Sequence, residues 1–241
     1  MAFESLAKPH SAPADHNQCV PDPLAHFKAI PWCASLLSDR AVVSVVVPDR
    51  RPLPTGESNF IRKTMNSPTT VRASLSFLRV VEPADIPAGG DEQQQKKKEK
   101  KKKKKKPLSE SEPLLRGGGP DDGEDPRSPF LLCNALADLG EDCTSYVGTM
   151  HGGLYGVLMD EVMGTAANFQ TENGAYTVGF TTRFRRAVSP PQIVLVRGRV
   201  VRKDGRKIHL RGTIEDKDGN IMAEGEGLWL AMNKKVGRSQ L

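Results

Sequence analysis

The clearest hydrophobic pattern in the chain is a helix that is apolar on every side. From Leu154 to Phe169, apolar or small residues occupy all faces of a helix, which is typical of a helix buried in a core. The pattern then changes to a two-residue period, with Tyr176, Val178, Phe180, Thr182 and Phe184 alternating with Thr177, Gly179, Thr181, Arg183 and Arg185. That alternation predicts a strand with one buried face.

Three more strands are predicted after this one, over Ile193–Val201, Ile208–Ile214 and Ile221–Met232. The pairs Asp204-Gly205 and Asp218-Gly219 separate them and supply the positive φ angles of tight hairpins. Within the second of these strands, the inward-facing positions are Ile208, Leu210, Gly212 and Ile214. Upstream, Val71–Val81 and Phe130–Leu139 also have strand character. One long helix with a meander of antiparallel strands predicts an α+β fold in which the helix lies on the sheet.

The 241 residues divide into one main domain and less regular flanking parts. Residues 1–70 are expected to form an N-terminal extension with short helices, one over Leu24–Leu37 interrupted near Pro31 and one over Glu57–Met65. The main domain covers 71–234, and a low-complexity insertion at about 83–128 interrupts it, because that segment consists largely of Gly, Pro, Lys, Asp and Glu. Residues 235–241 form a tail.

The net charge of +6 comes from one tract. Residues 96–106 contain ten Lys and one Glu, so the other 230 residues sum to −3. A block of like charge usually stays solvated and disordered, and contacts with nucleic acid, an acidic membrane surface or the nuclear import machinery are the alternatives. The folded part is mildly acidic, so no nucleic-acid partner is expected.

Cysteine usage and hydropathy indicate an intracellular protein. Cys19, Cys33, Cys133 and Cys143 show no CxxC spacing, so reduced, structural thiols are expected. Neither a signal peptide nor a transmembrane segment is visible. A cytoplasmic location follows, while mitochondria remain possible and the final Ser239-Gln240-Leu241, one residue from Ser-Lys-Leu, keeps peroxisomes open.

The run from His151 to Glu161 carries the candidate chemistry. It joins a glycine-rich turn to a helix with two adjacent carboxylates, Asp160 and Glu161, the only formal charges between His151 and Glu172. Burying an unpaired carboxylate costs several kcal/mol unless its pKa shifts or it finds partners. The helix is therefore a candidate catalytic element, although a core helix whose acids reach one edge would show the same pattern.

This run resembles the motif of the hotdog-fold acyl-CoA thioesterases of the 4-hydroxybenzoyl-CoA thioesterase superfamily, especially the phenylacetate-pathway-like branch. The resemblance covers about Ser128–Met232, and its most specific part is the His151-Gly152-Gly153 turn with Asp160 nine residues after the histidine. A weaker resemblance to fungal members extends over Asp22–Phe27 and Ile30–Cys33. The resemblance implies a hotdog fold, in which an antiparallel sheet wraps a long central helix, and hydrolysis of acyl-CoA or a carrier-bound acyl group.

Thioester hydrolysis requires a base or nucleophile and donors for the oxyanion. A glycine turn that opens a helix offers unpaired N–H groups and the positive end of the helix dipole, so Gly152 and Gly153 are the candidate donors. Asp160 is then the base or the nucleophile, and the sequence does not separate these two roles.

The resemblance assigns further residues around these three. Thr177 matches a Thr or Ser that positions the water, although a surface threonine is the alternative. His151 matches the motif histidine and is expected to give structural or donor support rather than act as base. Glu161 is expected to contact the chain or a subunit boundary. Relatives carry Asn where this chain has Ser145, which puts a side-chain contribution to thioester positioning in doubt.

Helix geometry predicts a site shared between subunits. His151 and Asp160 lie roughly 13 Å apart along the helix axis, too far to act on one carbonyl. Two antiparallel helices related by a two-fold axis would bring the Asp160 of one subunit to the glycine turn of the other. We therefore expect a homodimer or a dimer of dimers. No ligand spacing for a metal is visible, and no cofactor is expected apart from coenzyme A as part of the substrate.

Substrate contacts and competing functions are less well defined. Arg206 and Lys207, with Arg202 and Lys203, surround a hairpin that could hold the phosphates of coenzyme A, and a solvated hairpin is the alternative. An apolar acyl pocket is expected, with candidate residues at Tyr155, Met159, Met163 and Phe169. The competing functions are a hotdog hydratase or dehydratase and a non-catalytic hotdog dimer that serves as a binding or scaffold module.

Overall fold

The computed structural model describes residues 15–82 and 129–234, and a seven-stranded antiparallel sheet organises them. The strand order is β1-β2-β3-β7-β8-β9-β6, so β1 and β6 form the edges. The strands are β1 (Val42–Val46), β2 (Val71–Val81), β3 (Phe130–Leu139), β6 (Ala175–Phe184), β7 (Gln192–Asp204), β8 (Lys207–Glu215) and β9 (Ile221–Ala231). A small second sheet pairs β4 (Thr144–Tyr146) with β5 (Thr149–Met150).

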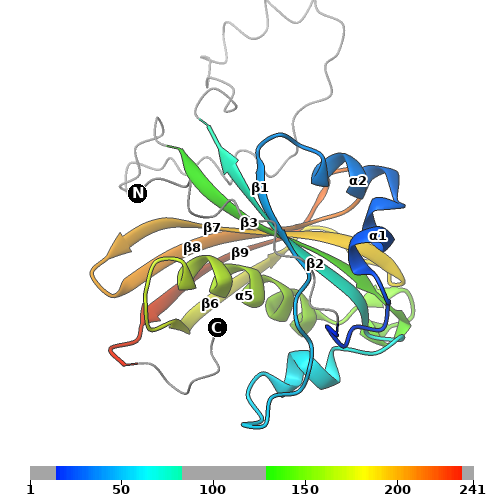
Figure 1. Cartoon of the computed structure of the whole chain (residues 1–241), viewed down its shortest axis with the longest axis horizontal. Coiled ribbons are helices and arrows are strands. Elements are labelled where there is room, and N and C mark those ends of the chain that lie inside the picture. Colours follow the sequence, from blue (N-terminus) through cyan, green and yellow to red (C-terminus); the bar gives the residue numbers. More distant parts are fainter. Residues whose placement is uncertain (1–14, 83–128, 235–241) are drawn as a thin grey trace, which may run out of the picture.

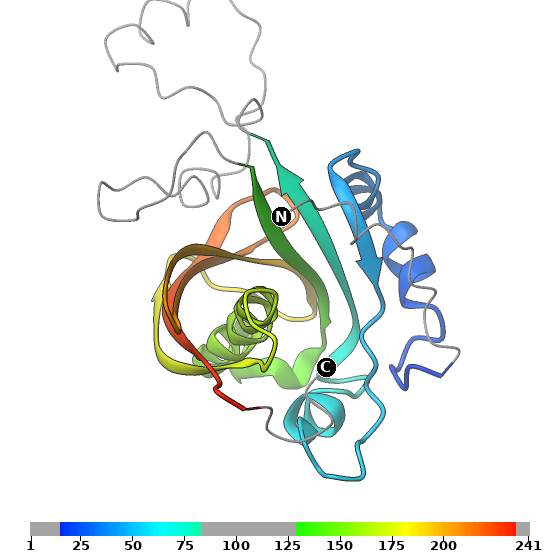
Figure 2. The same ribbon diagram turned by 60° about the vertical axis from the view of Figure 1, so that its left-hand side comes forward.

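The long helix α5 (Gly152–Asn168) lies inside the curved sheet, which wraps around it (Figures 1 and 2). Its buried face includes Tyr155, Met159 and Met163, which pack against β3, β7, β8 and β9. A Cβ added at Gly212 would lie 2.8 Å from the sulfur of Met163. Glycine at this sheet position therefore allows the helix to approach closely. A helix wrapped by an antiparallel sheet is the hotdog fold, as predicted.

The N-terminal region covers the opposite face of the sheet. Helices α1 (Pro23–Lys28) and α2 (Pro31–Leu37) lie outside β2 in Figure 2, and they bury Phe27, Cys33 and Leu37 against Leu75 and Leu136 of the sheet. The Asp22 carboxylate caps α1 by accepting a hydrogen bond from the Ala25 amide, at 2.9 Å. Beyond β1, the chain forms a loop and the short π-helical turn η2 (Phe60–Thr64) on the helix side.

Most predicted elements are confirmed, including the helix break near Pro31, the inward positions of β8 and the positive φ at Gly205 and Gly219. Two features differ from the predictions. Strand β1, of five residues, was not predicted and lies in the region expected to form short helices. The prediction that one face of β6 is buried is wrong for the single chain, in which most residues of β6 are exposed. β6 is an edge strand that pairs only with β9.

Several expectations concern parts of the chain outside the described residues. The lysine tract, the insertion at 83–128 and the tail at 235–241 all lie there. Among the residues that are described, no helix combines the length and apolar character needed to cross a membrane.

Candidate active site

The glycine turn caps the start of α5. His151 occupies the N-cap position in an extended conformation, and its Nδ1 accepts a hydrogen bond from the Gly153 amide at 3.0 Å. The ring therefore supports the turn, as expected of a structural histidine. The Gly152 amide has no acceptor within the described residues. Of the two predicted oxyanion donors, Gly152 is thus available, whereas Gly153 donates to His151.

The structure brings Thr177 and Asp160 into direct contact. The Thr177 hydroxyl on β6 donates a hydrogen bond to Oδ1 of Asp160 on α5, at 2.6 Å. Asp160 is half-buried and Thr177 is exposed. Because Thr177 has this specific partner, it is not simply a surface threonine of a strand. The pair offers an oriented carboxylate on an accessible face of the molecule.

One chain does not bring this carboxylate to the glycine turn. α5 runs without interruption from Gly152 to Asn168, so Gly152 and Asp160 are about 12 Å apart along its axis. The two halves of the predicted site therefore lie on one helix at separate positions.

The strand that carries Thr177 exposes large apolar side chains. Tyr176, Val178 and Phe184 of β6 are 50%, 56% and 59% exposed. An edge strand with exposed apolar residues presents free backbone groups and an apolar surface to another chain. Tyr176 and Val178 flank Thr177 in the sequence, and Thr177 contacts Asp160.

Glu161 lies on a different side of α5 from Asp160 and lines a cavity of about 230 Å³. Although part of its surface is exposed, burial raises the pKa of Glu161, the neighbouring Asp160 raises it further, and Arg50 and Arg62 oppose the shift. Its carboxyl group makes no hydrogen bond or ion pair with the described residues. Glu161 was expected to contact the chain or a subunit boundary, and its position at a cavity was not predicted.

The cavity lies between the outer side of α5, strands β2 and β3, and residues 48–65. The four residues expected to make the acyl pocket apolar do not line it. Tyr155, Met159 and Met163 are buried between helix and sheet, and Phe169 is 46% exposed. Sequence reasoning missed the cavity because residues 48–65 have no periodic pattern that would place them on α5.

The basic hairpin lies at the other end of α5 from the glycine turn. Lys203 donates to the carbonyl of Gln170, just beyond the helix, at 2.6 Å, and Arg206 Nε donates to the carbonyl of Ala231 at 2.8 Å. Arg206 and Lys207 are both exposed. Within one chain, these predicted phosphate contacts are not close to Gly152.

Other groups add little to the site. Ser145 is exposed on β4. Burial raises the pKa of Cys33 and Cys133 to about 12, so neither is a thiolate nucleophile at neutral pH. In the part of the chain that the structure describes, no three His, Cys, Asp or Glu residues are grouped to hold a metal ion.

Parts of this chain are similar to known proteins. Residues 147–223 match the model of the thioesterase superfamily. Among solved structures, similar ones include a thioesterase superfamily protein with 27% identity, covering 41% of this chain and 48% of that one, with a TM-score of 0.39. They also include the Escherichia coli PaaI protein from the phenylacetic acid degradation operon, with 15% identity, coverage of 44% and 76% and a TM-score of 0.42.

A third similar structure is zebrafish thioesterase superfamily member 2, with 20% identity, coverage of 42% of this chain and 75% of that one, and a TM-score of 0.39. The chain spans about half the length of the first of the three proteins. Comparison with curated proteins gives no match. The match to the thioesterase superfamily begins just before α5 and ends at the start of β9, and it confirms the resemblance seen in the sequence.

Proposed function

We propose that the protein is a thioesterase that hydrolyses an acyl-CoA, or an acyl group on a carrier protein, to the free acid and thiol. The observation that carries this proposal is the hydrogen bond from Thr177 to Asp160 inside the matched segment. It fixes one carboxylate oxygen and leaves Oδ2 of Asp160 without a partner among the described residues. That oxygen can accept a proton from water or attack the thioester carbonyl itself.

The second half of the proposed site is the glycine turn of another subunit. The unpaired amide of Gly152 at the positive end of α5 suits a developing oxyanion. Since one chain keeps Gly152 and Asp160 about 12 Å apart, we propose a homodimer in which each site takes Gly152 from one subunit and Asp160 from the other. The apolar surface of β6 supports this pairing, because a copy docked there would cover the Thr177–Asp160 pair.

A panel of acyl-CoA esters with detection of free thiol tests the function directly. We expect thiol release by the wild type, and loss of it in Asp160→Ala. Formation of a double bond or addition of water without thiol release would instead indicate a hydratase or dehydratase. Binding of the esters without any turnover would indicate a binding module.

A further inference from the structure

The cavity beside α5 is lined by residues from the start of the helix, next to the glycine turn. Leu154, Val157 and Leu158, from the first two turns of the helix, line one wall. Leu154 directly follows the glycine turn, and Glu161 lies seven residues further, about 10 Å along the axis. The cavity therefore runs along the outer side of the helix from Leu154, the residue next to the glycine turn.

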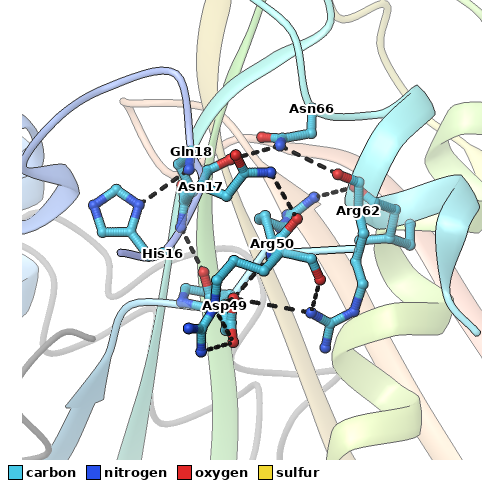
Figure 3. Close-up of polar contacts among 10 residues, drawn as sticks. His16, Asn17, Gln18, Asp49, Arg50, Arg62 and Asn66 are labelled. Atoms are coloured by element: carbon cyan, nitrogen blue, oxygen red, sulfur yellow. Dashed lines mark hydrogen bonds and ion pairs between the residues drawn. The ribbon is translucent and has the colours of Figure 1, made fainter. Parts of the chain in front are cut away.

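The opposite wall includes Arg50, and hydrogen bonds hold the backbone around it in place (Figure 3). The Arg50 amide donates to the carbonyl of His16 at 2.8 Å, and Asn17 Nδ2 donates to the carbonyl of Arg50 at 3.1 Å. Asn66 Nδ2 donates to the carbonyl of Asn17 at 2.7 Å. Residues from three separate parts of the chain thus fix Arg50 at the cavity.

Four charged residues line this cavity: Arg62 and Asp49 pair with each other at 3.9 Å, whereas Arg50 and Glu161 have no charged partner in contact among the described residues. The Arg50 guanidinium donates to the carbonyl of Ile61 at 2.8 Å and to the Ser74 hydroxyl at 2.9 Å, and neither partner is charged. Glu161 attracts Arg50 electrostatically, yet no ion pair joins them. Both side chains line the cavity, Arg50 from the N-terminal region and Glu161 from α5. A ligand group that both accepts and donates hydrogen bonds can satisfy both charges.

We propose that this cavity binds the acyl group of the substrate and selects short acyl groups that end in a hydroxyl. The inference rests on the proposed thioesterase function. The hydroxyl oxygen accepts from Arg50, its proton is donated to Glu161, and the apolar wall packs against the methylene groups. A terminal methyl leaves both charges unpaired, and a terminal carboxylate meets Glu161 as a like charge.

The size of the cavity limits the chain length. A volume of about 230 Å³ corresponds to roughly eight groups the size of a water molecule. A six-carbon acyl chain with a terminal hydroxyl fits within this volume, whereas long fatty acyl chains do not.

The test compares three CoA esters of equal chain length, namely hexanoyl-CoA, 6-hydroxyhexanoyl-CoA and adipoyl-CoA. We expect kcat/KM for the hydroxy ester to exceed that for each of the other two by about tenfold, the scale of one hydrogen bond to a charged group. Arg50→Met and Glu161→Leu should each remove this preference. Glu161→Leu breaks no hydrogen bond of the described chain, so it tests the inference even if Arg50→Met fails to fold.

Arg40→Met is the matched control. Arg40 is exposed and does not line the cavity, so the preference should persist. Hydrolysis of all three esters at similar kcat/KM would overturn the inference and leave the proposed function intact. Retention of the preference in Glu161→Leu would also overturn it. Absence of thiol release from every ester, including a wider acyl panel, would overturn the proposed function and the inference with it.

Discussion

Thr177 donates its hydroxyl proton to Oδ1 of Asp160 at 2.6 Å, and this contact joins the edge strand β6 to the middle of α5. The bond orients the carboxylate and leaves its second oxygen free within the described part of the chain. The pair lies beside the exposed apolar side chains of β6. We therefore propose Asp160 as the reacting carboxylate and β6 as the surface that meets another copy of the chain.

Replacing Asp160 tests the chemical role of this carboxylate. Asp160→Ala should fold and dimerise, yet lose acyl-CoA hydrolysis by on the order of a hundredfold or more, the scale of losing a general base. Glu161→Ala should have a smaller effect on a simple acyl ester. Steady-state kinetics of both variants decides which acid acts, and a larger loss in Glu161→Ala would contradict the assignment.

Removing the Thr177 hydroxyl tests whether orientation of Asp160 matters. Thr177→Val keeps the shape of the side chain but removes the donor, so kcat should fall on the order of tenfold. Thr177→Ser keeps the donor and should retain most activity. Equal kcat values for the two variants would show that the bond is incidental.

The sequence predicts the central elements because their patterns are local. The all-round apolar character of α5, the hairpin glycines and the alternation in β8 each follow from neighbouring residues. Strand β1 (Val42–Val46) was missed because it has only five residues, and these residues are mostly half-buried. For Tyr176 and Val178, alternation correctly indicated a strand, but exposure depends on the edge position of β6, which sequence order does not reveal.

Prediction of the candidate site was limited in the same way. The motif picked out Asp160 and the glycine turn, and the family resemblance pointed to Thr177. Arg50 and Glu161 line the same cavity although they are more than one hundred positions apart in the sequence. No local sequence pattern predicts this proximity, because it depends on how the N-terminal region packs against the folded sheet.

The apolar edge of β6 predicts an interface. Val178→Lys places a charge on this exposed edge strand, and it should shift the protein to a monomer with little hydrolytic activity. Val178→Thr, which keeps a β-branched side chain, is the control and should remain dimeric. Analytical ultracentrifugation with parallel activity measurements checks this, and a fully active monomer would refute the shared site.

The raised pKa of Glu161 predicts a pH dependence of stability. An acid whose pKa is higher in the folded state binds its proton more tightly there, so its contribution is present below the ordinary pKa and is lost as pH rises through the raised value. Glu161→Gln removes this loss. The Tm of this variant minus that of the wild type should therefore be higher at about pH 7 than at about pH 4, and a pH-independent difference would contradict the shift.

Gly152 offers a way to remove one amide without disturbing the helix. It occupies the first position of α5, where proline is tolerated, and His151 before it is extended with ψ of 129°, as a residue preceding proline requires. An added Cβ would meet Phe184 at an ordinary 3.6 Å. Gly152→Pro should therefore fold and lose kcat on the order of a hundredfold, the scale of one oxyanion donor, while Gly152→Ala keeps the amide and most activity.

Mixing two inactive variants tests the shared site most directly. In a heterodimer of Asp160→Ala and Gly152→Pro, one site combines an intact glycine turn with an intact Asp160, and the other site carries both defects. Random reassociation of equal amounts should therefore restore about a quarter of wild-type hydrolysis, since half of the dimers are mixed and each has one working site of two. Activity that stays at the sum of the two residual activities, in a sample shown to contain heterodimers, would contradict a site built from two subunits.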